Sequence, residues 1–237
     1  MRFGPVDERI EKPKRCERYD DVILYHGSRG GIEGEIQPIS RVRCDFGKGF
    51  YMGENRLQSA GLVVDDSNPV LYTVKFRLSE IQPEKILTLE GEQWLQTILA
   101  CRKRCQEFSQ LDLANRLLKR LDHYDVIIGP IADDRMTEAI HRFEEYNLTD
   151  KALLACLQSV DYGKQYVCKT DTACQKVEIL GEKSIYGREA DQIREYSVDM
   201  RAKGRDIVTQ MQLLHQRDGL FLNELVARER GRENNVR

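Results

Sequence analysis

The sequence has no long apolar segment, little net charge and no paired cysteine motif. Its longest apolar stretch, 126–132, is interrupted by Gly129 and Pro130 and falls far short of the roughly 20 residues that cross a bilayer, so a membrane protein is not expected. The formal net charge is −2, so no overall field draws the chain onto DNA or an acidic membrane. The first 15 residues mix both charge signs and contain no apolar core, so we do not expect them to be a signal peptide.

The seven cysteines are an odd number at irregular spacings, and none of them belongs to a CxxC pair. Neither a zinc quartet nor a thioredoxin-type site is indicated. Cys101 and Cys105 are four residues apart in a helical pattern, with His123 as a conceivable third ligand, but two thiols packed on one helix face explain them better. We expect reduced thiols in a cytoplasmic protein without a metal site.

The chain has 237 residues, of which 41% are hydrophobic, and this is enough for one large domain or for one domain with an appendage. Charged residues reach 32% of the chain, above the roughly 25% of typical globular domains. A wholly disordered chain is not expected from this composition.

Short runs rich in β-branched and aromatic residues predict strands at 22–27, 46–53, 70–78, 124–129 and 164–170. The run at 70–78 alternates apolar and polar residues, which predicts a half-exposed strand. The helical patterns are one or two helices over 94–121, helices over 136–146 and 150–157, and a short helix that is capped by Asn55 and runs to Val64.

Strand patterns end near Ser184, and 189–230 are helical in pattern, with breaks expected at Gly204 and Gly219. The apolar positions in this part need a surface to pack against, either the rest of the chain or a partner protein. They are Ile207, Met211, Leu214, Leu220, Leu222 and Leu225. We expect an α+β fold with an N-terminal arm at 1–20, a domain at 21–181, and a helical C-terminal appendage at 182–237 that is not part of the functional site.

Several familiar signatures fail. Gly47-Lys48-Gly49 is not a Walker A loop, because no glycine stands at position 42 and no Ser or Thr follows the lysine; an HExxH motif is absent. Three short segments remain, which are Tyr25-His26-Gly27-Ser28, Gly47-Lys48-Gly49-Phe50-Tyr51 with Ser59 eight residues later, and Lys164-Gln165-Tyr166-Val167. Taken singly, His26 is a structural histidine, Tyr51 a core residue and Gln165 a surface residue at a strand entrance.

Taken together, the three segments resemble the ADP-ribosyltransferases of the diphtheria-toxin and poly(ADP-ribose) polymerase type, which carry a His-Tyr-Glu triad on three strands of a split sheet around NAD. The residues over 21–181 are similar to a bacterial family of uncharacterised ADP-ribosyltransferase-like domains that often lie beside small antitoxin-like proteins. That likeness rests on DFGKGFYMG at 45–53, Trp94-Leu95, YDVIIGPIADDR at 124–135, and Lys169-Thr170 after Gln165. It implies a split β-sheet core with flanking helices.

The resemblance also implies that NAD is the co-substrate and that no metal takes part. His26, Tyr51 and Gln165 would be the catalytic residues, and His26 would donate to a hydroxyl of the adenosine-side ribose. The remaining contacts to NAD would come from Gly27 and Ser28 in the first motif, Tyr51 stacked on the nicotinamide ring, and Ser59 bonded to its carboxamide. The second stacking aromatic of the polymerases is replaced by Leu62.

Gln165 stands where the resembled enzymes carry their catalytic Glu. Its amide oxygen can still accept a hydrogen bond from a ribose hydroxyl, but it brings no negative charge to the oxocarbenium-like transition state. The loss of such an electrostatic partner typically costs about 3 kcal/mol or more. Asp133 and Asp134 follow a buried strand and are the candidates for a replacement carboxylate, unless they only cap the next helix.

The function expected on this resemblance is NAD-dependent mono-ADP-ribosylation by a toxin or effector. The partners would be NAD, a protein or nucleic-acid acceptor and an antitoxin protein, with no membrane. An NAD glycohydrolase and a catalytically silent NAD-binding module are the alternatives. Gly163 stands where arginine-directed transferases carry a Glu, so an arginine acceptor is not supported. The basic helix face at 102–120 contacts a nucleic acid or is only solvated, and Arg29, Arg41 and Arg43 contact the pyrophosphate or are likewise solvated.

Overall fold

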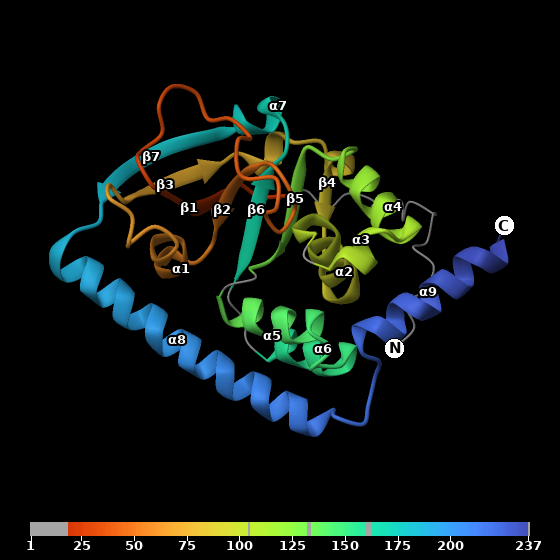
Figure 1. Ribbon diagram of the computed structural model, residues 1–237. Coiled ribbons are helices and arrows are strands. Elements are labelled where there is room, and N and C mark those ends of the chain that lie inside the picture. Colours follow the sequence, from red (N-terminus) through yellow and green to blue (C-terminus); the bar gives the residue numbers. More distant parts are fainter. Residues whose placement is uncertain (1–18, 104, 132–133, 160–162, 237) are drawn as a thin grey trace.

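The computed structural model describes residues 19–103, 105–131, 134–159 and 163–236, so nearly all of the arm predicted at 1–20 lies outside the described residues. Its centre is a seven-stranded mixed sheet in the order β4-β5-β6-β2-β1-β3-β7 (Figure 1). The strands are β1 Val22–Ser28, β2 Phe50–Gly53, β3 Val70–Phe76, β4 Ile86–Thr88, β5 Val126–Pro130, β6 Lys164–Cys168 and β7 Val177–Ser184. Only β4 and β5 pair in parallel; the other neighbours are antiparallel.

The helices of the described residues lie between and after the strands along the chain, and together with the mixed sheet they confirm the α+β class. They are α1 Arg56–Gly61, α2 Gly91–Arg102, α3 Gln106–Ser109, α4 Asp112–Leu121, α5 Asp134–Glu144, α6 Asp150–Gln158, α7 Asp171–Cys174, α8 Gly187–Leu214 and α9 Leu222–Val236. Two short 3-10 turns lie at Leu78–Glu80 and Pro83–Lys85. None of the described helices combines the length and the apolar character needed to cross a bilayer.

All five predicted strands are present, and β4 and β7 are additional. The three-residue β4 is too short to show a pattern. β7 pairs with β3 along its whole length at the edge of the sheet, and all but its first residue are exposed, so its side chains carry no apolar alternation. β3 keeps the predicted alternation from Tyr72 to Phe76, where Thr73 and Lys75 are half-buried and the residues between them are buried. Leu71, on the same face as Thr73, is buried, so the exposed face is shorter than predicted.

The helix boundaries depart from the predictions where local backbone chemistry intervenes. The region predicted as one or two helices over 94–121 is three helices, because Lys103 adopts a left-handed conformation (φ 51°) at the end of α2 and Cys105 Sγ caps α3 by accepting from the Phe108 N–H. Asn55 caps α1 as predicted, by accepting from the Gln58 N–H, but the helix ends at Gly61. α8 continues through Gly204, whereas the chain does break at Gly219 (φ +91°).

The C-terminal helices are part of the main core rather than an appendage to it. Leu222, Leu225 and Val226 of α9 and Val208 of α8 are buried in the same apolar cluster as Trp94 and the inner face of α2. In α8, Met211 packs against this cluster and Ile207 is partly buried beside the buried Val208, whereas Leu214 is 71% exposed, so the packing predicted for Leu214 is wrong. The predicted boundary after 181 falls inside β7, since the pairing of β7 with β3 continues to Ser184.

The long helix α8 lies against α1, α5 and α6 (Figure 1). Polar contacts fix the turn that follows it. Asp150, at the start of α6, exchanges backbone and side-chain hydrogen bonds with Leu220, at 2.9 and 2.8 Å. In α9, Glu233 accepts from the backbone N–H of Leu113 in α4 at 3.3 Å. The helices α8 and α9 thus pack against the helices α4, α5 and α6.

We expect Leu225→Ala to lower the free energy of unfolding by about 3 kcal/mol, because it leaves a cavity in the shared core. Leu214→Ala is the matched control on an exposed position, and its effect should stay within about 0.5 kcal/mol. Urea unfolding followed by circular dichroism measures both variants. Equal stabilities for the two variants would contradict the placement of α9 in the core.

Candidate functional site

The three motif segments lie on three adjacent strands, although up to 139 positions separate them in the chain. β6, β2 and β1 are consecutive neighbours in the sheet. Gln165 pairs with Gly53 and Tyr51 with Val167, so Gln165 and Tyr51 project from the same face two positions apart in register. Tyr25 pairs with the same Gly53, so the next residue, His26, projects from the opposite face, where its ring packs on Phe50. The structure therefore brings Tyr51 and Gln165 together on one face and places His26 on the other face of the adjacent strand.

β1 and β2 are paired at one position only, Tyr25 with Gly53, and they diverge beyond it. Residues 26–28 of β1 pair with β3 on the other side. The side chain of His26 bridges the divergence, with its Nδ1 2.7 Å from the backbone oxygen of Tyr51. A carbonyl oxygen can only accept, so Nδ1 carries the proton in this contact.

His26 is neutral in this setting. Burial lowers the pKa of His26 below its ordinary value, and the hydrogen bond to Tyr51 only partly opposes this. The ring stacks at a tilt on Phe50, with 4.3 Å between ring centroids. With the proton on Nδ1, the Nε2 atom is an acceptor, so a ribose hydroxyl would donate to His26 rather than accept from it, contrary to the direction expected on the resemblance.

Gly27 packs directly against Ser59 of α1. This packing alone requires a glycine at position 27, whether or not NAD binds there. A Cβ at Gly27 would lie 2.3 Å from the backbone oxygen of Ser59, so α1 can pack on β1 only when this position has no side chain. Ser59 is buried, and its Oγ donates to the backbone oxygen of Tyr25 at 3.3 Å. Ser28 faces away from this contact, since its Oγ donates to the backbone oxygen of Gly31 at 2.8 Å.

Tyr51 is half-buried and organises the loop before β2. Its hydroxyl donates to the backbone oxygen of Gly47 at 2.7 Å and accepts from the N–H of Phe46 at 3.0 Å. Burial raises the pKa of Tyr51 far above its ordinary value, so the phenol stays protonated. Leu62, at the position of the second stacking aromatic, is 59% exposed just after α1.

Gln165 is buried, so its reading as a surface residue is wrong. Its Nε2 donates to Asp45 Oδ2 and to the backbone oxygen of Pro130, both at 3.0 Å. Both amide protons are thereby used. Among the described residues, no group donates to its Oε1, so this oxygen keeps its capacity to accept.

Asp45 is the carboxylate that the structure places at Gln165. Its Oδ1 accepts from Arg102 Nε at 2.9 Å and Nη2 at 2.8 Å, and both side chains are at least 86% buried. The sequence prediction assigned this role to Asp133 or Asp134. Asp133 lies outside the described residues, and of Asp134 only its place as the first residue of α5 is described. Asp45 is the first residue of the 45–53 segment that carries the resemblance, but no spacing in the sequence indicates that it contacts Gln165 or Arg102.

Gly163 occupies the position at which arginine-directed transferases carry a Glu, and the surrounding residues leave no room there for a side chain. Its φ is +77°, and a Cβ there would lie 2.9 Å from Glu54 Oε2. The Glu54 carboxylate accepts from the Lys164 N–H at 2.7 Å and from the Tyr166 hydroxyl at 3.0 Å. A second carboxylate at position 163 would therefore clash with Glu54.

The remaining candidates are peripheral. Arg29 forms a solvent-exposed ion pair with Asp66 at 3.4 Å, and Arg41 and Arg43 are exposed. Within the part of the chain that the structure describes, no three His, Cys, Asp or Glu side chains are grouped to hold a metal ion.

Comparison with known proteins relates the chain to a protein family. The family model described as Protein of unknown function (DUF3990) matches residues 22–179, which includes the three motif strands and Asp45. No curated protein and no solved structure matches the chain.

The buried neutral state of His26 predicts a pH dependence of stability. Between the ordinary pKa of 6.5 and the lowered pKa in the folded protein, the unfolded chain binds the extra proton. The contribution of His26 to stability should therefore be complete above pH 6.5 and decline as the pH falls below it, by at most about 1.4 kcal/mol per pH unit.

Urea unfolding of the wild type and of His26→Gln at pH 7.5 and 5.5 measures this contribution. The difference in the free energy of unfolding between the two proteins should shrink at pH 5.5. A constant difference would show that His26 is not held neutral.

Proposed function

The chain belongs to the DUF3990 family of proteins of unknown function, and we propose that it is an NAD-dependent mono-ADP-ribosyltransferase. The observation that carries the proposal is the convergence of three distant segments around the diverging strands β1 and β2. A sheet that opens between a His-Gly strand and a Tyr strand, with a hydrogen-bond acceptor on the next strand, matches the split-sheet NAD site that the sequence resembles.

NAD would lie where β1 and β2 part. The backbone of Gly27 would hold the nicotinamide carboxamide, because residues 26–28 have no strand partner on the β2 side. The ring of Tyr51 would stack on the nicotinamide, and its hydroxyl is already bound within the protein, so the face of the ring and not the hydroxyl makes the contact. Ser59 Oγ, next to Gly53, would complete the carboxamide contacts, and His26 Nε2 would accept from a ribose hydroxyl.

The reaction breaks the bond between C1′ of the ribose and the nicotinamide nitrogen, and the nicotinamide takes the bonding electrons with it. The acceptor's nucleophilic atom then bonds to C1′ and loses its proton to solvent. Gln165 Oε1 would accept from the ribose 2′-hydroxyl near the cationic carbon. The hydrogen bond from Gln165 Nε2 to the Asp45 carboxylate polarises the amide and makes its oxygen a stronger acceptor.

Asp45 also pairs with Arg102, so the group formed by Gln165, Asp45 and Arg102 carries no net negative charge. This predicts slow transfer, and it specifically favours one alternative, NAD binding without turnover. Hydrolysis of NAD by water is the other alternative that shares this site. The proposed setting is that of a toxin or effector with a protein or nucleic-acid acceptor and an antitoxin partner, acting in the cytoplasm.

Nicotinamide release decides between these activities. Incubation with NAD alone should give little nicotinamide, and addition of cell lysate should raise its release and attach label from NAD to macromolecules. Digestion of the labelled material with protease or nuclease then identifies the class of acceptor. Release at the same rate without lysate would favour the glycohydrolase, and calorimetric NAD binding without any release would favour the silent module.

Tyr51→Ala should weaken NAD binding by about 1–3 kcal/mol, by analogy with the stacking of bases on aromatic side chains. Tyr51→Phe keeps the ring and removes only the hydroxyl contacts to Gly47 and Phe46, so it should retain most of the affinity. Tyr186→Ala, on an exposed tyrosine, is the control and should bind as the wild type does. Calorimetry with NAD measures all three variants. Unchanged affinity in both Tyr51→Ala and His26→Ala would remove the proposed NAD site.

Gln165→Glu should not accelerate nicotinamide release, although it restores the residue of the resembled enzymes. The new carboxylate would face Asp45 Oδ2 and the Pro130 oxygen, both 3.0 Å from the present Nε2, and the like charges would hold it in its protonated form. The double variant Asp45→Asn with Gln165→Glu reverses the pair, since the Asn amide donates to the new carboxylate. We expect it to release nicotinamide about tenfold or more faster than Gln165→Glu alone. A tenfold rise in the single variant would show that Asp45 does not control this position.

A further inference from the structure

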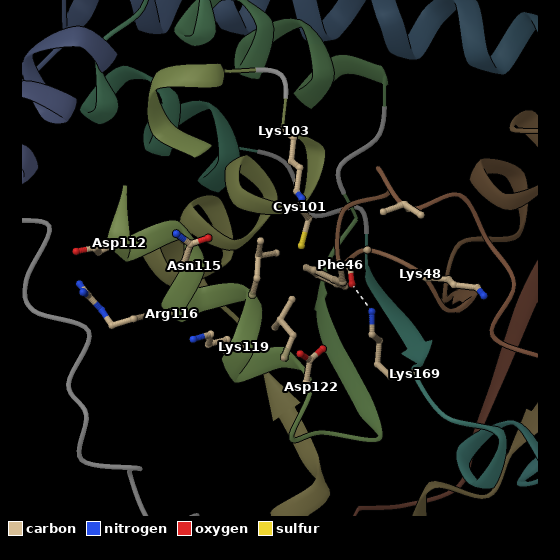
Figure 2. A pocket seen from close by; sticks show the side chains of 14 residues that line it. Phe46, Lys48, Cys101, Lys103, Asp112, Asn115, Arg116, Lys119, Asp122 and Lys169 are labelled. Carbon is tan, nitrogen blue, oxygen red and sulfur yellow. Dashed lines mark hydrogen bonds between the residues drawn. The ribbon is translucent and has the colours of Figure 1, made fainter. Parts of the chain in front are cut away.

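A second concave site lies beside the loop at 42–48, and neither His26 nor Tyr51 nor Gln165 lines it. It is a pocket of about 750 Å³ between this loop, the end of α2, the exposed face of α4 and the residue that follows β6 (Figure 2). This volume is within the range of roughly 300–1,000 Å³ that small-molecule sites occupy. The pocket is therefore large enough for a ligand of its own.

The lining of the pocket is strongly basic. Figure 2 shows Arg116 and Lys119 of α4 on one side, Lys48 and Lys169 on the other, and Lys103 above them. Against these five cations stand two carboxylates, Asp112 and Asp122, so the lining has a net charge of +3 in a chain of net charge −2. None of the five cations forms an ion pair with another described residue.

Lys169 is the anchored member of this set. It is half-buried, and its ammonium donates to the backbone oxygen of Phe46 at 2.5 Å. An ammonium has three donors, and Phe46 is its one acceptor among the described residues. Burial lowers the pKa of Lys169 although the nearby Asp122 partly opposes the shift, and an anion in the pocket would relieve that cost.

We propose that this pocket binds a small anion that carries two or more linked phosphates, such as the polyphosphate part of a nucleotide. Phosphate oxygens match flexible lysine ammonium groups and the planar guanidinium of Arg116, and several negative charges are needed to balance the lining. The five cations all line one pocket, and four separate segments of the chain contribute them. This favours a compact polyphosphate over the extended backbone of a nucleic acid.

The test is isothermal titration calorimetry with sodium tripolyphosphate as the probe. Arg116→Glu and Lys119→Glu reverse single charges on exposed side chains, so both variants should fold, and each should weaken binding at least about tenfold through loss of a charge-assisted hydrogen bond. Lys203→Glu makes the same change on the exposed face of α8, away from the pocket, and should leave the affinity unchanged. Affinity should fall as salt is raised.

Three results would overturn the proposal. Absence of tripolyphosphate binding at millimolar concentration is the first. An equal loss of affinity in Lys203→Glu and Lys119→Glu would show a diffuse attraction and no site. A single-stranded oligonucleotide that displaces tripolyphosphate and binds more tightly, with the same dependence on Lys119, would assign the pocket to an extended phosphate backbone. Because the pocket shares no lining residue with the NAD contacts, failure here leaves the proposed transferase activity untouched.

Discussion

The carboxylate of Asp45 accepts from Arg102 at the end of α2 and from Gln165 in β6, and so it ties a loop, a helix and a strand together at the centre of the molecule. A buried ion pair repays its desolvation only when its geometry is good and its remaining lone pairs are satisfied. Both oxygens of Asp45 are satisfied here, since Oδ1 receives two bonds from Arg102 and Oδ2 receives the Gln165 amide, whereas Arg102 Nη1 is buried and has no hydrogen-bond partner among the described residues. Removal of either partner would leave a buried charge, which typically costs about 3–5 kcal/mol. The amide at position 165 is thus part of the framework as well as of the candidate chemistry.

The same loop is held from two further directions. The Tyr51 hydroxyl bonds to Phe46 and Gly47, and the ammonium of Lys169 bonds to the carbonyl of Phe46. The ring of Phe46 is fully buried against Gly129, where a Cβ would lie 2.8 Å from it. This segment therefore contacts both candidate sites: Asp45 bonds to Gln165, whereas Phe46 and Gly47 line the basic pocket.

The divergence of β1 and β2 depends on residues that look ordinary in the sequence. Gly27 permits α1 to approach β1, and the Ser59 that comes with α1 reaches the Tyr25 backbone. His26 then spans to Tyr51 where the two strands no longer pair. A sheet opened in this way offers backbone groups to a planar ligand without exposing a full strand edge.

The local sequence pattern alone predicted the five strands β1, β2, β3, β5 and β6. It also predicted the Asn55 cap and the α+β class. It could do so because burial on a sheet face and helix capping depend on residues that are close together in the chain. It also singled out His26, Tyr51 and Gln165, through their resemblance to a family motif. The partnership of Asp45 with Gln165 and Arg102, the neutral tautomer of His26, and the burial of α9 were decided by tertiary structure. Each of these depends on groups brought together from 25 to 120 positions apart, and no spacing within one segment encodes such a contact. The sequence did not predict the exposed strand β7 for the same reason. β7 is defined by its backbone hydrogen bonds to β3, and its own side chains face water on both sides of the sheet, so they show no apolar alternation.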